Sequence, residues 1–449
     1  MRISVLISLF LIFVVTEISA QIVITNPGRV AERAVENRAN QKVYQGVDKG
    51  FDKIEEGIGN LFKKKKKEEK PAGNQQKPSE PSDSQDNNQP DENNTIKGKK
   101  ASLQTYSKFD FISGEKVIVQ EDFSQDEVGD FPAKWNTNST GELVTVEGTK
   151  GKWLSLSKAG TTMPEFITSL PENFTLEFDL LVNNEFSFYS SEFRVAMASL
   201  SNPKEFTKWQ RFKHDEITGT DISFHPMDAG SGNGRTSFDV FNKSNKSEMH
   251  NEENTSQFFA SKNNFAHVSI WRQKQRLRVY LNEEKVWDLP RAMDLAVNYN
   301  SLIFYLQDFH KAEDRYLISN LRLAVGAPDT RNKLITEGKF VTTGITFDVN
   351  SATIKPESYG TLKTIAQVLQ DNADVRVKII GHTDADGEDN TNLNLSKKRS
   401  EAVKAILSSD FGINSSRLES DGKGESQPVG DNKTPEGKAN NRRVEFVKL

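Results

Sequence analysis

Two side chains of opposite charge, Asp384 and Arg399, are well suited to bind a small zwitterion. Asp384 ends the segment Gly381-His382-Thr383-Asp384, and Arg399 follows fifteen positions later. An aspartate can receive an ammonium group, and a guanidinium can hold a carboxylate with two parallel hydrogen bonds. The alternative is a salt bridge between the two that merely ties a loop to a helix. Their spacing alone leaves both interpretations open.

A strand and a helix must position this pair. Residues 375–379 alternate between apolar and basic types, which predicts a strand that runs into the loop carrying Asp384. Apolar residues then recur at helical spacing within residues 395–407, and Asn390 to Asn392 offers N-cap residues before them. We therefore expect Arg399 about two turns into a helix, able to fold back towards the strand end.

Two other chemistries for the same loop fit less well. Residues 384–390 are rich in oxygen ligands, which suits calcium. However, the glycine stands at the fourth position and no Glu stands at the twelfth, so the EF-hand pattern fails. His382 has no Cys, Ser or metal-ligand partner at a recognisable spacing, and we expect it to be a packing or hydrogen-bonding residue. The sequence thus predicts binding here, with no metal, no cofactor and no catalytic residue.

Ordered motifs surround the pair within residues 338–449. They are Ile345-Thr346-Phe347-Asp348, Gly381-His382-Thr383-Asp384, Leu395-Ser396, Gly422-Lys423-Gly424-Glu425 and Asn440-Asn441-Arg442-Arg443-Val444-Glu445-Phe446. In this order they resemble the OmpA-like C-terminal domain, the peptidoglycan-binding module also found in peptidoglycan-associated lipoproteins and flagellar stator proteins. The resemblance implies an α/β (α+β) fold, a mixed sheet with helices on one face.

The resemblance also implies a ligand. Asp384 and Arg399 would hold the diaminopimelate side chain of the peptidoglycan stem peptide, with Asp384 at its amino end and Arg399 at its carboxylate. Other groove residues implied by the resemblance are Thr383, Asp348, Asn392 and Arg442. Arg442 could instead form a strand-to-helix salt bridge.

The N-terminal residues point to the cell envelope. Residues 1–20 have a basic start, an apolar run and a small residue before Gln21, which predicts a secretory signal peptide. Because the chain has no Cys, it has no disulfide and cannot carry a lipidated N-terminal Cys. We therefore expect a non-lipidated protein of the periplasm, associated with the outer membrane and the cell wall. The net charge of -4 gives no reason to expect nucleic acid.

Two segments follow the predicted signal peptide. Residues 21–67 read as an amphipathic helical segment that ends in the basic run Lys63 to Lys67. Its apolar face, within residues 27–67, could contact an outer-membrane protein, an anionic membrane surface or this protein's own domains, and all three stay open. Residues 68–100 are polar and rich in Pro, Gln and Asn, which predicts a disordered linker.

Residues 101–330 predict an all-β domain. Short alternating runs, such as residues 174–182, 276–281 and 316–325, are separated by turn residues without helical patterns, which indicates a sandwich. The runs Phe174-Thr175-Leu176-Glu177-Phe178 and Val268-Ser269-Ile270-Trp271-Arg272 resemble the jelly-roll sandwich of laminin-G and concanavalin-like lectin domains. This weaker resemblance implies a possible glycan ligand at the sandwich.

An enzymatic alternative rests on two carboxylates. Glu177 and Asp179 lie two apart on a predicted strand and so face the same side, as the acids of a glycoside hydrolase would. The lectin-like hydrolases add a third acid shortly afterwards, and residues 180–183 supply none, so we expect binding without catalysis. Tryptophans could form a glycan platform, but we expect most of the five to be core residues.

Together these patterns predict a multidomain envelope protein. An N-terminal amphipathic helix and a linker would precede a jelly-roll-like β-sandwich and an OmpA-like α/β domain. Such a chain would link the outer membrane or a periplasmic assembly to the cell wall without covalent bonds.

Overall fold

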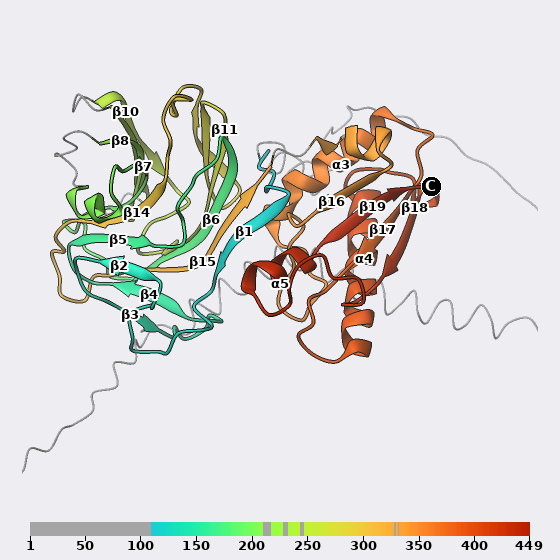
Figure 1. Ribbon diagram of the computed structural model, residues 1–449, viewed down its shortest axis with the longest axis horizontal. Coiled ribbons are helices and arrows are strands. Elements are labelled where there is room, and N and C mark those ends of the chain that lie inside the picture. Colours follow the sequence, from blue (N-terminus) through green and yellow to red (C-terminus); the bar gives the residue numbers. More distant parts are fainter. Residues whose placement is uncertain (1–108, 210–216, 228–231, 243–246, 327–328, 331) are drawn as a thin grey trace, which may run out of the picture.

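The computed structural model describes residues 109–449, except 210–216, 228–231, 243–246, 327–328 and 331. The predicted signal peptide, amphipathic segment and linker therefore lie outside the described residues. Figure 1 shows two units side by side, an all-β unit followed by an α/β unit.

The all-β unit is built from strands joined mainly by short turns. Its strands are β1 (Lys116–Glu121), β2 (Trp135–Thr137), β3 (Gly141–Val144), β4 (Trp153–Leu156), β5 (Gly160–Pro164), β6 (Asn173–Val182), β7 (Phe193–Ser199), β8 (Thr218–His225), β9 (Gly234–Phe241), β10 (Ser247–Thr255), β11 (Phe265–Gln273), β12 (Arg276–Leu281), β13 (Glu284–Leu289), β14 (Ser301–Leu306) and β15 (Tyr316–Val325). A short 3-10 helix, η1 (Pro203–Lys208), follows β7.

These strands form two antiparallel sheets that pack face to face, as a sandwich requires. Within the described residues, one sheet has eight strands in the order β13-β12-β11-β6-β15-β4-β3, with β1 also paired to β15. The other has seven, in the order β10-β9-β8-β7-β14-β5-β2. The predicted strands at residues 174–182, 276–281 and 316–325 correspond to β6, β12 and β15.

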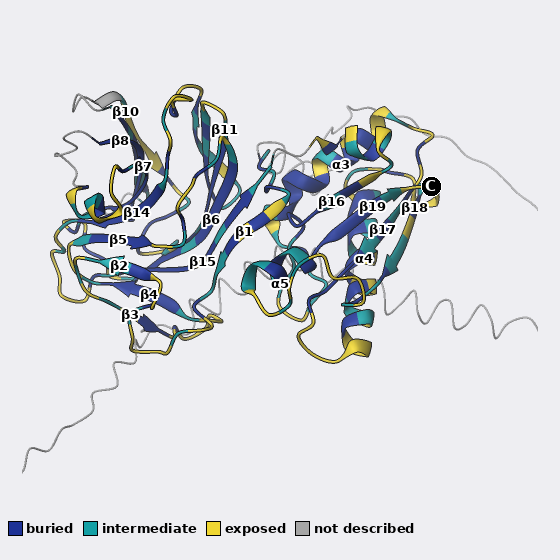
Figure 2. Ribbon diagram, in the orientation of Figure 1, coloured by how far each residue is buried: buried dark blue, intermediate teal, exposed yellow. Residues whose placement is uncertain are grey.

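Alternation along the strands builds the core between the sheets. In β7, Phe193 and Val195 join the main apolar cluster, whereas Ala196 belongs to a second cluster on the other side of the sheet. All five tryptophans are buried, which confirms that they are core residues and not an exposed platform. Figure 2 shows this continuous burial where the two sheets face each other.

The α/β unit has a mixed sheet in the order β16-β19-β17-β18, in which β17 and β18 run parallel. Its strands are β16 (Lys339–Thr342), β17 (Val377–Gly381), β18 (Leu418–Gly422) and β19 (Val444–Lys448). Its helices are α3 (Tyr359–Asp371), α4 (Asp389–Ser409) and α5 (Pro435–Asn441), with the short η2 (Asn332–Thr336), η3 (Pro356–Ser358) and η4 (Ser415–Arg417). Apolar residues of α3, α4 and the sheet share one core.

Across the described part of the chain, no helix combines the length and apolar character needed to cross a bilayer.

Glu177 and Asp179 face the same side of β6, as predicted, and both meet His267 of β11. His267 Nδ1 lies 2.7 Å from Asp179 Oδ1, and its Nε2 lies 3.6 Å from Glu177 Oε2. Arg322 approaches the other oxygen of Glu177 at 2.5 Å. Burial alone would raise the pKa of Glu177, but Arg322 and His267 outweigh it and lower that pKa to about 2. A glycosidase acid needs a raised pKa, so this pair lacks the property that the enzymatic alternative requires.

His267 gives a prediction about pH. Burial would lower its pKa, but the hydrogen bond to Asp179 and the nearby carboxylate of Glu177 prevail and raise it from 6.5 to about 10. Its contribution to stability is therefore complete below about pH 6.5 and is lost as the pH rises through about 10. We expect His267→Gln to lower the free energy of unfolding by about 2 to 3 kcal/mol at pH 6 and to flatten its decline above neutral pH.

Urea unfolding of the full chain between pH 6 and 10 measures this effect. His250→Gln is the matched control, because His250 also contacts an aspartate, Asp239, but its side chain is more exposed. Equal losses in both variants, or an unchanged pH dependence for His267→Gln, would contradict the assignment.

Candidate functional site

The candidate site forms where β17 ends against α4. A Cβ atom at Gly381 would lie 2.3 Å from the main-chain oxygen of Ser396, so only glycine allows the helix to come this close. The next residues of the chain, His382 to Asp384, leave the strand alongside α4. This close packing brings the loop with Asp384 beside the helix that carries Arg399.

Asp384 forms an ion pair with Arg442, the residue that follows α5. Its Oδ2 accepts from Arg442 Nη1, and its Oδ1 accepts from the main-chain nitrogen of Asp386 at 3.3 Å. The loop-to-helix salt bridge considered for Asp384 and Arg399 is therefore not the arrangement found. Arg442 does form a salt bridge, but with this loop and not between strand and helix.

Arg399 is held by main-chain oxygens and an aromatic ring. Its Nε donates to Ser351 O at 2.9 Å, its Nη2 donates to Asp348 O at 3.4 Å, and its Cζ lies 4.9 Å from the ring centre of Phe347. Nη1 has no hydrogen-bond partner among the described residues. Burial and the nearby Arg442 lower the pKa of Arg399 to about 10, so the guanidinium stays cationic at neutral pH.

Asn392 ties the loop to α4, but not as the N-cap that the sequence predicted. The helix starts earlier, after Glu388, which places Asn392 inside its first turns. From there its Nδ2 donates to the main-chain oxygens of Asp384 and Asp386, at 3.3 and 3.1 Å, and to Glu425 Oε2 at 2.5 Å. Its side chain thus serves a tertiary contact instead of the helix end.

Thr383 and His382 are both buried beside the site. The main-chain nitrogen of Thr383 donates to Gly424 O at 3.0 Å, while its hydroxyl has no partner in the described part of the chain. His382 Nε2 lies 3.5 Å from Glu445 Oε1, inside the sheet and away from the groove. This placement agrees with a packing role for His382.

The six predicted site residues are therefore brought together by direct contacts or by neighbouring positions. Sequence reasoning missed several of their partners, Phe347 under Arg399, Glu425 against Asn392, and Lys438, which donates to both oxygens of Asp386. The signal for Lys438 was present, because it precedes Arg442 by four residues and so shares a helix face with it.

Positively charged side chains already pair with two carboxylates of the loop that was considered for calcium. Asp384 is paired with Arg442 and Asp386 with Lys438, so two of its carboxylates already have positive partners. Among residues with described placement, no group of three or more His, Asp or Glu side chains is arranged to hold a metal ion.

Comparison with known proteins identifies the unit around this site. The sequence profile of the OmpA family matches residues 346–442. Residues 346–442 form an OmpA family domain. This match does not include the β-sandwich that precedes it.

The relatives reported below match about a quarter of this chain. The probable lipoprotein YiaD of Escherichia coli K12 is 42% identical over 103 residues, which cover 23% of this chain and 47% of YiaD. Outer membrane porin F of Pseudomonas fluorescens is 43% identical over 101 residues, covering 22% of this chain and 31% of the porin. The chain thus matches less than half the length of either relative. The solved peptidoglycan-associated lipoprotein of Burkholderia pseudomallei is 27% identical, covering 27% of this chain and 98% of that one, with a TM-score of 0.23.

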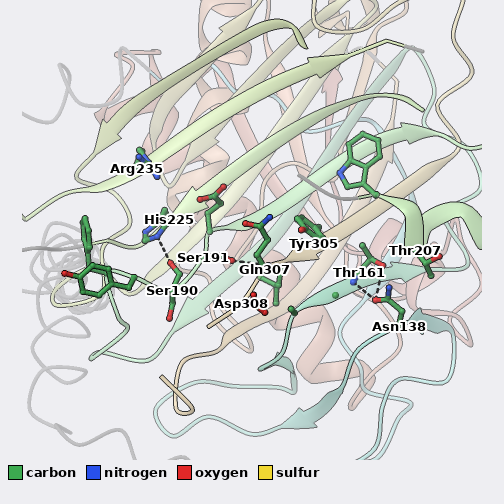
Figure 3. A pocket seen from close by; sticks show the side chains of 17 residues that line it. Asn138, Thr161, Ser190, Ser191, Thr207, His225, Arg235, Tyr305, Gln307 and Asp308 are labelled. Carbon is green, nitrogen blue, oxygen red and sulfur yellow. Dashed lines mark hydrogen bonds between the residues drawn. The ribbon is translucent and has the colours of Figure 1, made fainter. Parts of the chain in front are cut away.

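A second candidate region is a cavity of about 660 Å³ in the β-sandwich (Figure 3). It lies beside the apolar cluster that contains Trp209 and Tyr305. Two aromatic rings stand at its edge, Tyr189 with 76% of its surface exposed and Phe188 with 41%. Their rings meet edge to face with centres 5.4 Å apart, and Tyr189 also packs against His310 at 5.2 Å.

The loop that presents these rings is anchored by the buried Asp314. Asp314 accepts from the main-chain nitrogen of Ser187 at 3.1 Å and from the Ser190 hydroxyl at 2.5 Å. The same hydroxyl accepts from the main-chain nitrogen of His310 at 2.7 Å. These hydrogen bonds fix the loop that carries the two exposed rings.

Proposed function

We propose that residues 346–442 bind peptidoglycan by gripping diaminopimelate of the stem peptide. The hydrogen bonding of Arg399 is the observation that carries this proposal. Its guanidinium is fixed through Nε and Nη2, yet Nη1 has no described partner, and the carboxylate of Asp384 is near enough to act on its charge. A fixed cation next to a fixed anion matches a ligand end that carries both an ammonium and a carboxylate group.

Binding would need little rearrangement of charge. The ammonium group of diaminopimelate would meet Asp384, whose charge Arg442 already balances in the absence of ligand. Its carboxylate would meet Arg399, and the amides at the N-terminus of α4 favour anionic groups nearby. Because both site charges are 91% or more buried, each charge-assisted bond contributes more than it would at an exposed surface.

The envelope setting supports the same reading. Similar proteins are named as an outer membrane porin and a probable lipoprotein, and one solved structure is named as a peptidoglycan-associated lipoprotein. We propose that this chain resides in the periplasm and links the outer membrane or a periplasmic assembly to the wall. Its predicted signal peptide and N-terminal amphipathic segment would supply export and the second attachment.

For the sandwich we propose saccharide binding at the cavity beside Tyr189. Sugar rings offer apolar C–H faces that stack on aromatic rings, and hydroxyl groups that need hydrogen-bonding partners. The exposed rings of Tyr189 and Phe188 offer stacking surfaces for sugar rings. The hydroxyl of Tyr305, for which no partner is described, offers a hydrogen-bonding group for sugar hydroxyls. An anchored loop favours this use, because rings already held in place lose little entropy on binding.

Peptidoglycan binding is tested by sedimentation with purified sacculi. We expect Asp384→Ala and Arg399→Ala each to weaken binding about 10-fold to 100-fold, since each removes a charge-assisted bond. Glu388→Ala is the control, because this carboxylate is exposed in the same loop and makes no side-chain hydrogen bond to the start of α4. Circular dichroism should show unchanged folding. If both site variants still sediment like the wild type, the assignment is wrong.

Saccharide binding is tested with glycan strands freed of stem peptides and, in parallel, with neutral polysaccharides. We expect the full chain to be retarded in affinity electrophoresis by one of the two, and Tyr189→Ala to weaken that binding about 5-fold to 10-fold. Phe265→Ala is the matched control, because Phe265 is 40% exposed but lies on β11, away from the cavity. Absence of retardation by either polymer, or equal losses in the two variants, would refute the proposal.

A further inference from the structure

Helix α5 lies between the sandwich and the candidate site (Figure 1). Glu436 and Asn440 of this helix are spaced four apart, as are Lys438 and Arg442, the residue that follows the helix, so each pair lies on one side of it. Glu436 and Asn440 face the sandwich, while Lys438 and the following Arg442 face the site loop. One short element thus contacts both units of the protein.

On the sandwich side, Asn440 binds the outer edge of β1. Its Oδ1 accepts from the main-chain nitrogen of Val117 at 3.0 Å, and its Nδ2 donates to the main-chain oxygen of Val117 at 2.9 Å. The amide side chain therefore pairs with β1 as a neighbouring strand would, and it satisfies both polar groups of one residue. Ala439 packs beside it against Val117 and Ala324, which makes the contact partly apolar.

On the site side, α5 and the residue after it supply cations to the loop that carries Asp384. Lys438 Nζ lies 2.7 and 3.0 Å from the two oxygens of Asp386, and Arg442 pairs with Asp384. Asn441 connects α5 to the loop at residues 429–432, and Asn432 in turn accepts from the main-chain nitrogen of Ala385 at 3.2 Å. A shift of α5 would therefore displace both the partner and the backbone of the Asp384 loop.

We propose that Asn440 is a positioning residue, which holds α5 on the sandwich and so fixes Arg442 and the Asp384 loop for ligand binding. The sandwich would then contribute to the affinity of the protein for the cell wall, and would not only be attached to the wall. This proposal rests on the proposed function for its effect on affinity. Linkage makes the effect reciprocal, so an occupied site would tighten the contact between α5 and β1 by the same factor.

The first test measures affinity for a soluble muropeptide that contains diaminopimelate, by calorimetry with the full chain. We expect Asn440→Ala to weaken binding about five-fold, as loss of a hydrogen-bonded contact implies. In an Arg442→Ala background, Asn440→Ala should have a smaller effect, because part of its action passes through Arg442. Lys333→Ala is the control, since Lys333 contacts Glu115 near the start of β1 but does not touch α5.

The second test needs no ligand. Hydrogen exchange of peptides that cover residues 382–386 should speed up in Asn440→Ala and stay unchanged in Lys333→Ala. The two tests separate the two claims. If the wild-type chain does not bind muropeptide, the proposed function is wrong. The exchange experiment still shows whether Asn440 positions the Asp384 loop. Unchanged exchange in Asn440→Ala, or equal changes in the two variants, would overturn the role of Asn440.

Discussion

The balance of buried charge is the constraint on which the rest of this structure depends. Asp384 and Arg399 are only 8% and 9% exposed, and an uncompensated charge at that depth would be strongly destabilising. Arg442 balances Asp384, and main-chain oxygens with the ring of Phe347 hold Arg399. The elements that supply these partners, α5 and the loop at residues 347–351, must therefore dock accurately on the sheet.

The same constraint acts at the face of the sandwich that carries Glu177. Glu177 is buried there and Asp179 is partly buried beside it, and His267 and Arg322 balance their charges. Arg322 also donates through Nη2 to Thr343 Oγ1 of the α/β unit at 2.8 Å. Like the Lys333–Glu115 pair and the bonds of Asn440, this is a polar contact between the two units. The two carboxylates on which the enzymatic alternative rested thus belong to a polar network that extends to the contact between the units.

Sequence alone predicted the features that depend on local periodicity or on an ordered motif. Alternation located β6, β12 and β15, and the motif order located the domain that the OmpA family profile matches. Prediction from sequence failed where contacts between distant parts of the chain determine the local structure. Asn392 looks like an N-cap, but its amide is used across the groove, and the charged edge strand β10 has none of the apolar alternation that marks a buried strand. The pairing of Asp384 with Arg442, 58 positions away, follows from the docking of α5 and not from any local pattern.

The position of α5 shows why the two units cannot be treated as independent modules. A helix of seven residues is too short to be stable by itself, so its place must come from what it contacts. Its contacts are the edge of β1 on one side and two loop carboxylates on the other. Because neither side alone surrounds the helix, the geometry of Arg442 reflects both. A displacement of the sandwich relative to the sheet would therefore act on Arg442 through this helix. The sandwich and the proposed wall-binding site thus share one structural element.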